Sequence, residues 1–201
     1  MRQRRIPWGW LLAISLSLLL IIASFRFDDA VRTWQHIHRW KHIPQLSRNV
    51  TRATDWPAQV LAGLSLAGLA WWRGNKKWTR VLLAMILAGT MAGGTAYVLK
   101  LSTGRVRPSV KVEKVWSGPD LRQNFQSFPS GHTAFASGFV GVLFFVSWRL
   151  GLLFLPIPIF IAFSRVFLGA HYLSDVICAA VLGLLCAFIV AALILREAKP
   201  L

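Results

Sequence analysis

The chain has 201 residues, of which 55% are hydrophobic, and its mean hydropathy is +0.53. This composition excludes an ordinary soluble domain, because several uncharged stretches approach the roughly 20 residues that cross a bilayer as a helix. The net charge of +16 would suggest nucleic-acid binding in a soluble protein. Here, Lys and Arg residues lie between hydrophobic segments, where they set orientation and contact anionic lipid head groups. We therefore expect the lipid bilayer, and no nucleic acid, as a partner.

Six hydrophobic segments predict an all-α, polytopic membrane protein. In chain order they are residues 8–25, 56–72, 81–99, 134–148, 150–163 and 176–195. Helices are expected because unpaired backbone groups cannot face lipid. The fifth segment is short enough to be a re-entrant or buried helix, but a tight turn at Arg149 and the need to recross the membrane favour a span. The sequence contains no internal repeat or long linker, which predicts a single domain over residues 1–201.

The first hydrophobic segment follows a basic start, as a secretory signal peptide does. Its apolar run of 18 residues exceeds the roughly 7–15 residues typical of such a peptide. No clear small-x-small cleavage site follows it. We therefore expect residues 8–25 to remain as the first membrane helix.

Basic residues are distributed unevenly between the connecting segments. If the N-terminus is cytoplasmic, the inner segments are residues 1–7, 73–80, 149 and 196–201. The outer segments are then residues 26–55, 100–129 and 164–175. The inner set holds ten Lys and Arg in 22 residues, whereas the outer set holds thirteen in 72. The positive-inside rule then predicts a multi-pass protein with both termini in the cytoplasm. The small size and compact topology indicate a bacterial inner membrane.

The first outer segment contains three histidines close together: His36, His38 and His42. Such a cluster is one way to hold a metal ion. However, residues 34–42 contain no Cys or carboxylate, and Trp34, Ile37 and Trp40 recur at helical spacing. A short helix at the membrane interface explains this pattern more simply, so we predict no metal site here.

Three basic residues adjoin the ends of predicted spans on the outer face: Lys100, Arg107 and Arg165. An Arg guanidinium binds phosphate oxygens through a two-donor fork. Each residue alone is typical of interfacial lysines and arginines that extend towards the membrane surface. Their occurrence together, at helix ends on one face, favours a binding site for a phosphate dianion.

A second phosphate-binding element is expected at the start of the fourth span. Pro129 is suited to the first turn of a helix, where its missing N–H has no cost. The backbone N–H groups around Ser130 and Gly131 would then lie at a positive helix end, which attracts anions. Gly131 also allows a ligand to approach the backbone closely.

Two histidines complete the predicted site. His171 and Asp175 are spaced i, i+4, so they share one face of a helical turn. The carboxylate can hold one imidazole nitrogen and leave the other free to attack. His132 lies beside the phosphate-binding turn and can protonate a leaving oxygen. Singly, His132 could be only a helix cap, and His171 with Asp175 only a structural ion pair.

These residues resemble the type 2 phosphatidic acid phosphatase family, which shares its core with the vanadium haloperoxidases. The family pattern is K-x6-R-P, then P-S-G-H, then S-R-x5-H-x3-D. The chain matches it without a departure at Lys100–Pro108, Pro129–His132 and Ser164–Asp175. The resemblance implies a six-helix membrane fold.

The resemblance also implies a role for each residue. Lys100, Arg107 and Arg165 would hold the phosphoryl oxygens, with Ser130 and the Gly131 N–H beside them.

The remaining three residues would carry the reaction. His171 would attack phosphorus and become a phosphohistidine, while Asp175 would orient it. His132 would protonate the leaving group and then activate the hydrolytic water. The family works without a metal ion, so no cofactor is expected.

The implied function is removal of phosphate from a membrane lipid at the outer leaflet. Undecaprenyl diphosphate, phosphatidylglycerol phosphate, phosphatidic acid and lipid A 1-phosphate share the recognised group, and the motifs do not choose between them. Transfer of the phosphate to an acceptor lipid is an alternative. A non-catalytic lipid-binding protein or transporter is a third, and it would not need His171 beside Asp175. The oligomeric state stays open.

Overall fold

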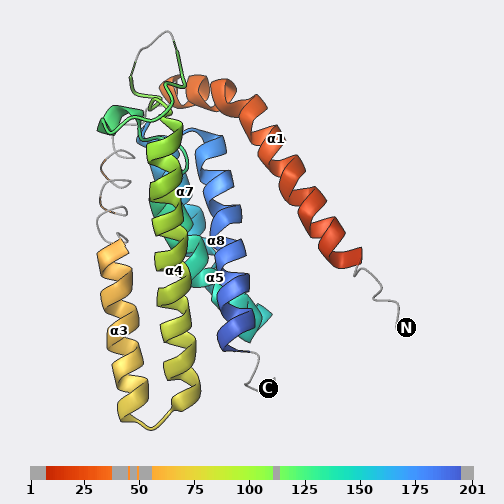
Figure 1. The fold of residues 1–201 in the computed structure, drawn as a ribbon, viewed down its shortest axis with the longest axis vertical. Coiled ribbons are helices and arrows are strands. Elements are labelled where there is room, and N and C mark those ends of the chain that lie inside the picture. The colour runs from red at the N-terminus through yellow and green to blue at the C-terminus, as the bar shows by residue number, and fades with distance from the viewer. Residues whose placement is uncertain (1–7, 38–44, 46–48, 50–55, 111–113, 196–201) are drawn as a thin grey trace.

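A computed structural model describes residues 8–37, 45, 49, 56–110 and 114–195 of the chain. These residues form helices and loops, with one isolated β-bridge between Arg105 and Trp116. The helices are α1 (Trp8–Ile37), α3 (Trp56–Trp72), α4 (Lys76–Thr103), α5 (Gly131–Val146), α6 (Trp148–Phe154), α7 (Pro156–Phe167) and α8 (Leu173–Ile194), with a short 3-10 turn at Gln123–Phe125 (Figure 1). The predicted all-α class is confirmed.

The six predicted segments correspond in order to α1, α3, α4, α5, the pair α6–α7, and α8. Four are long and apolar enough to cross a membrane: Leu11–Gln35, Lys76–Thr103, Trp148–Phe167 and Leu173–Ile194. The pair α6–α7 is therefore a 20-residue rod, longer than the predicted fifth segment. The expected turn at Arg149 is wrong, because the chain breaks at Ser147, whose φ of −161° is extended, and Arg149 lies inside α6.

Small residues bring α4, α5 and α8 together as the core of the bundle. A Cβ atom on Gly138 of α5 would lie 2.7 Å from the Ala88 carbonyl oxygen of α4. A Cβ atom on Gly183 of α8 would lie 2.6 Å from the Ala134 carbonyl oxygen of α5. The backbones of α4 and α5 are therefore in close contact, and so are those of α5 and α8. Such close packing is common where lipid supplies no hydrophobic driving force between helices.

Helix α1 packs against α8 at one end of the molecule and diverges from it at the other (Figure 1). Most of its large apolar side chains are exposed, as expected of a surface that faces lipid. Three polar side chains on α1 are nevertheless buried, namely Ser24, Asp28 and Gln35. Two of these lie in residues 26–37, which were predicted as an outer segment but continue α1 as a helix.

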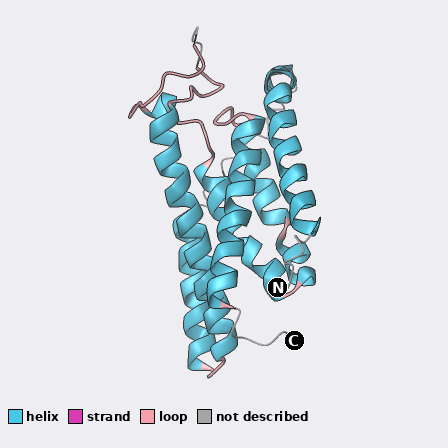
Figure 2. Ribbon diagram, turned by 45° about the vertical axis from the view of Figure 1, so that its right-hand side comes forward, coloured by secondary structure: helices cyan, strands magenta, loops and turns pink. Residues whose placement is uncertain are grey.

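The segments that carry the predicted motifs meet at one end of the bundle. Figure 2 shows the helices running along a common long axis, with the longest connecting loop at that end. The end of α4, the start of α5, the end of α7 and the start of α8 all lie there, whereas α1 begins and α8 ends towards the opposite end (Figure 1). The antiparallel arrangement therefore gathers motifs that are up to 75 residues apart in the chain.

Candidate active site

The three predicted cations converge on the start of α5. Lys100 lies in the last turn of α4, Arg107 in the loop that follows, and Arg165 in the last turn of α7. The charges of Arg107 and Arg165 both act on Lys100. The Lys100 ammonium is the nearest neighbour, at 3.9 Å, of a Cβ atom built on Gly131. These contacts support a shared anion site at the helix start.

Arg107 is half-buried and its main-chain N–H donates to the Asn124 carbonyl at 2.9 Å. Its side-chain Nε is buried and has no hydrogen-bond partner among the described residues. Burial lowers the pKa of the Arg107 guanidinium, because removal from water disfavours its charged form. An anion with several oxygens is the ligand that would accept hydrogen bonds from the Arg107 guanidinium.

Helix α5 begins at Gly131, with Ser130 as its N-cap, so Pro129 precedes the helix and the expectation that it occupies the first turn is wrong. The Ser130 N–H is already used, because it donates to the main-chain carbonyl of Asp175 at 3.1 Å. The first intrahelical bond runs from the Ala134 N–H to the Ser130 carbonyl at 2.9 Å. The N–H groups of residues 131–133 therefore have no acceptor within the helix and form the anion-attracting end.

His171 lies in the loop between α7 and α8 and is 2% exposed. Its Nδ1 is 2.6 Å from the Ser127 carbonyl oxygen, which can only accept a hydrogen bond. The proton is therefore on Nδ1, and Nε2 carries the lone pair. Burial lowers the pKa of His171 to about 4 despite the opposing Asp175 carboxylate, so the ring is neutral at pH 7.

The contact between His171 and Asp175 differs from the predicted one, because His171 precedes α8 and does not share a helical turn with Asp175. Asp175 was expected to hold the imidazole nitrogen, but its Oδ2 is 3.5 Å from His171 Nδ1 and the Ser127 carbonyl is nearer. The carboxylate is instead occupied by the Ser127 hydroxyl (2.5 Å) and the Tyr172 N–H (2.8 Å). Asp175 thus acts on His171 mainly as a nearby buried negative charge.

The loop that carries His171 is tied to Arg165. The N–H groups of Ala170 and His171 both donate to the Arg165 carbonyl, at 3.1 and 3.3 Å. Gly169 makes the required reversal with a φ of +66°, which side-chain-bearing residues rarely adopt. One turn of chain therefore fixes the predicted nucleophile relative to a predicted phosphate ligand, and the charge of Arg165 acts on the His171 ring.

His132 lies in the first turn of α5 and is half-buried. Together with Lys100 and Gly131 it lines a cavity of about 410 Å³. The rest of the wall is mostly apolar, aromatic or small: Trp56, Thr90, Gly93, Gly94, Tyr97 and Phe135. Polar groups at one end of an apolar cavity suit an amphipathic ligand.

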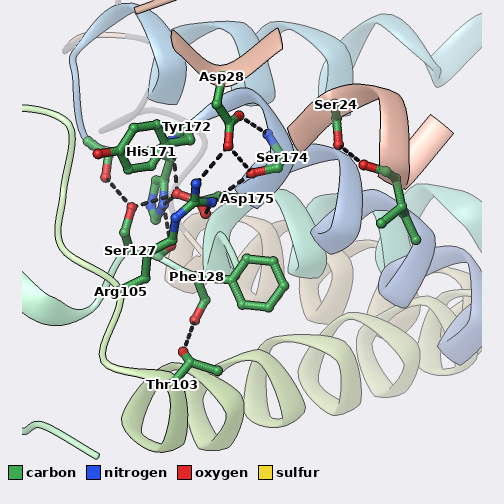
Figure 3. A network of polar contacts seen from close by, with 12 residues as sticks. Ser24, Asp28, Thr103, Arg105, Ser127, Phe128, His171, Tyr172, Ser174 and Asp175 are labelled. Carbon is green, nitrogen blue, oxygen red and sulfur yellow. Dashed lines mark hydrogen bonds and ion pairs between the residues drawn. The ribbon is translucent and has the colours of Figure 1, made fainter. Parts of the chain in front are cut away.

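Three residues at this site were missed by sequence reasoning, namely Asp28, Arg105 and Ser127 (Figure 3). Arg105 Nη1 donates to Asp175 Oδ1 at 2.5 Å, and Arg105 Nη2 donates to Asp28 Oδ2 at 2.6 Å. A signal for Asp28 was present, because an ionisable residue at the end of an apolar membrane segment is often functional. Ser127 offered none, since its main-chain carbonyl makes the key contact.

The sequence also singled out three histidines in the first outer segment. His38, His42 and the side chain of His36 lie outside the described residues. The choice between an interfacial helix and a metal site there therefore stays a prediction.

Comparisons with known proteins identify the family of this chain. The model of the PAP2 superfamily matches residues 77–199. A lipid A 1-phosphatase of Porphyromonas gingivalis is 27% identical over 84% of this chain and 36% of its own length. A lipid A 1-phosphatase of Rhizobium etli is 31% identical over 56% of this chain and 46% of its own length. The chain thus spans less than half the length of these curated relatives.

Two solved structures share the fold. A PAP2-type phosphatidylglycerolphosphate phosphatase from Bacillus subtilis superimposes with a TM-score of 0.69 and 24% identity, covering 92% of this chain and 96% of that one. Aquifex aeolicus LpxE superimposes with a TM-score of 0.57 and 20% identity, covering 83% and 95%. Because the family model matches more than half of the sequence, including every predicted site residue, the chain belongs to the PAP2 superfamily.

Proposed function

We propose that this protein is a membrane phosphatase that hydrolyses the phosphate of a lipid through a phosphohistidine at His171. One observation carries the proposal: the buried His171 places its Nδ1 2.6 Å from the Ser127 carbonyl oxygen, which can only accept and so holds the ring proton on Nδ1. Burial lowers the pKa of His171 to about 4, so the ring is neutral at pH 7. Its Nε2 therefore carries the lone pair that a nucleophile needs.

In the first step, Nε2 of His171 forms a bond to phosphorus while the bond from phosphorus to the leaving oxygen breaks. His132 gives its proton to that oxygen. The phosphorylated ring keeps its Nδ1 proton and becomes positively charged, which the Ser127 carbonyl and the Asp175 carboxylate stabilise. Lys100, Arg107, Arg165 and the first N–H groups of α5 offset the negative charge on the phosphoryl oxygens.

In the second step, water attacks phosphorus and gives one proton to His132, which acts as the base. The bond from phosphorus to Nε2 breaks, inorganic phosphate leaves, and His171 returns to its neutral form. No step requires a metal ion, because the three cations and the helix start supply the positive charge.

The substrate is proposed to be a membrane lipid that ends in a phosphate or diphosphate. The apolar cavity beside Lys100 and His132 supports this, since it can receive part of an acyl or prenyl chain. The names of the relatives point in the same direction: lipid A 1-phosphate for two of them, and phosphatidylglycerol phosphate for a structural neighbour. We further propose that the site faces the outside of the inner membrane, as the charge distribution predicts.

The test is release of inorganic phosphate by the purified full chain in detergent from four lipids: undecaprenyl diphosphate, phosphatidylglycerol phosphate, phosphatidic acid and lipid A 1-phosphate. We expect turnover of at least one, persistence in excess chelator, and loss of at least about 1,000-fold in His171→Ala, because the nucleophile is gone. Retained turnover in a folded His171→Ala protein would refute the mechanism. Appearance of the phosphate on a second lipid instead of in solution would indicate a phosphotransferase.

A further inference from the structure

We propose that Asp28 of α1 and Arg105 are positioning residues that hold Asp175 and the His171 loop in their reactive arrangement. This inference rests on the proposed function, in which His171 is the nucleophile. It extends the active-site assembly to α1, which lies outside the residues matched by the PAP2 family model. The evidence is a buried polar network that joins three separate parts of the chain (Figure 3).

Arg105 is the centre of this network. Its Nη1 donates to Asp175 Oδ1 (2.5 Å) and to the Ser174 hydroxyl (2.6 Å), and its Nη2 donates to Asp28 Oδ2 (2.6 Å). The three charged side chains are at most 7% exposed. A guanidinium can bridge two carboxylates in this way because its donors form a rigid planar fork.

Asp28 acts directly on the start of α8. Its Oδ1 accepts the main-chain N–H of Ser174 at 2.8 Å, and its Oδ2 accepts the Ser174 hydroxyl at 2.6 Å. Ser174 lies in the first turn of α8, where N–H groups have no intrahelical acceptor and a negative charge is favourable. A residue of α1 therefore serves as a cap for the helix that carries Asp175.

The charges of the network explain why Arg105 is needed as well as Asp28. Two buried carboxylates, Asp28 and Asp175, both contact the guanidinium of Arg105, which lies between them. Without Arg105, these carboxylates would repel each other in a region of low dielectric, and Asp175 would move or take up a proton. In either case it would no longer be a fixed anion beside the His171 ring.

Arg105 itself is held tightly. Its guanidinium carbon is 4.1 Å from the centre of the Tyr172 ring and 4.8 Å from that of Trp116, which are attractive cation–π contacts. Its main-chain carbonyl accepts the Ser127 N–H at 2.9 Å. The Ser127 carbonyl in turn sets the tautomer of His171. Arg105 is therefore connected to Asp175 through its side chain and to His171 through its backbone.

A second contact from α1 holds the other end of the same loop. Gln35 Nε2 donates to the main-chain carbonyl of Phe167, the last residue of α7, at 2.8 Å. Asp28 and Gln35 thus fix the chain on both sides of His171. This accounts for buried polar side chains on a helix that otherwise exposes apolar residues.

The experiment compares Arg105→Gln, Arg105→Lys and Asp28→Asn with the wild type, using dioctanoyl phosphatidic acid or whichever of the four lipids the wild type hydrolyses. The matched control is Arg122→Gln, which breaks an Arg–Asp pair on the same loop whose arginine side chain is 72% exposed. kcat, KM and melting temperature in detergent are measured for each. The control should match the wild type in all three.

We expect Arg105→Gln to lower kcat about 100-fold and Asp28→Asn about 10-fold, while KM changes less than about threefold, as for residues that orient a reactive group from behind. Arg105→Lys should recover part of the loss, because one ammonium carries the charge but cannot contact both carboxylates. A purely structural role would instead lower the melting temperature and the active fraction without this selective fall in kcat.

The outcomes separate this inference from the proposed function. If the wild type is active and His171→Ala is not, but folded Arg105→Gln and Asp28→Asn turn over at the wild-type rate, the positioning role is overturned and the phosphatase stands. If Arg105→Gln does not fold, Asp28→Asn decides, because it keeps the shape of the side chain and an acceptor for the Ser174 N–H. Activity in His171→Ala would overturn the proposed function itself.

Discussion

A single carboxylate often both fixes the tautomer of a catalytic histidine and stabilises its positive charge. Here the Ser127 carbonyl has the first role and Asp175 has the second. The carbonyl accepts the Nδ1 proton of His171 at 2.6 Å, so the tautomer does not depend on Asp175. Asp175 supplies negative charge at 3.5 Å, which matters most when the ring becomes positively charged during phosphoryl transfer. The two contributions can therefore be separated by mutation.

Asp175→Asn keeps the shape of the side chain and removes its charge. Since the tautomer of His171 persists, we expect kcat to fall about 10- to 100-fold, rather than the roughly 10,000-fold seen when a carboxylate alone sets the tautomer. Steady-state kinetics on the lipid that the wild type hydrolyses would measure this. A loss as complete as in His171→Ala would show that the charge, and not the carbonyl contact, is indispensable.

The depressed pKa of His171 links stability to pH. An unfolded chain binds a proton on this residue below its ordinary pKa of 6.5, whereas the folded protein does so only near pH 4. Between these values the unfolded state binds more protons, so stability is fully present above pH 6.5 and falls as the pH drops towards 4, by up to about 3 kcal/mol. Unfolding in detergent should show this loss in the wild type and a smaller loss in His171→Gln. Equal losses in both proteins would contradict the neutral, buried state of His171.

At the scale of elements, the end of α4 determines where Arg105 and Arg107 leave the helix. Gly104 terminates α4 with a φ of +58°, and its N–H donates to the Lys100 carbonyl. A Cβ atom there would lie 1.7 Å from the Gly118 carbonyl oxygen, so the following loop crosses directly over this glycine. The turn and the crossing together direct Arg105 towards Asp175 of α8 and Arg107 towards Lys100.

Gly104→Ala should therefore destabilise the protein and reduce the activity of the molecules that remain folded. Gly74→Ala is the matched control, because Gly74 also follows a helix with a positive φ, of 71°, but a Cβ atom there meets nothing within 4 Å. We expect the control to lose about 1 kcal/mol of stability from backbone strain alone, with unchanged kcat. Melting temperature and kcat test both variants. Indistinguishable results would show that the crossing over Gly104 does not matter.

For the whole molecule, every helix end that bears a site residue lies on one side of the bundle, while α1 begins and α8 ends towards the other (Figure 1). The turn between α3 and α4 is also on that second side. The distribution of Lys and Arg predicts that this second side faces the cytoplasm. A lipid phosphate would then be reached only from the outer leaflet.

This orientation is testable with single cysteines after replacement of Cys178 and Cys186 by Ala. Leu121→Cys is placed in the loop beside the site, where Leu121 is 79% exposed, and Arg73→Cys in the exposed turn between α3 and α4. In sealed cells, a membrane-impermeant thiol reagent should label only the first variant, and both should react after permeabilisation. Labelling of Arg73→Cys in sealed cells would reverse the orientation and, with it, the outer-leaflet substrate.

The sequence by itself determined the helical class and the residues that gather at the site. Hydropathy acts along a continuous stretch of chain, so the six segments were visible without a structure. The end of α1 was misplaced, because the helix continues to Ile37, 12 residues beyond the predicted end of the first segment at residue 25. The basic and histidine motifs were visible too, because each adjoins the end of a predicted span. Their meeting on one side followed from the alternation of helix directions.

The tertiary structure alone decided how these residues are held. Ser127 and His171 are 44 residues apart, Arg105 and Asp175 are 70 apart, and Asp28 and Ser174 are 146 apart. No local pattern relates such positions, and the contact that sets the tautomer of His171 uses a main-chain carbonyl that every residue possesses. The site residues follow from side-chain chemistry in the sequence, whereas their orientation depends on backbone groups that only packing brings together.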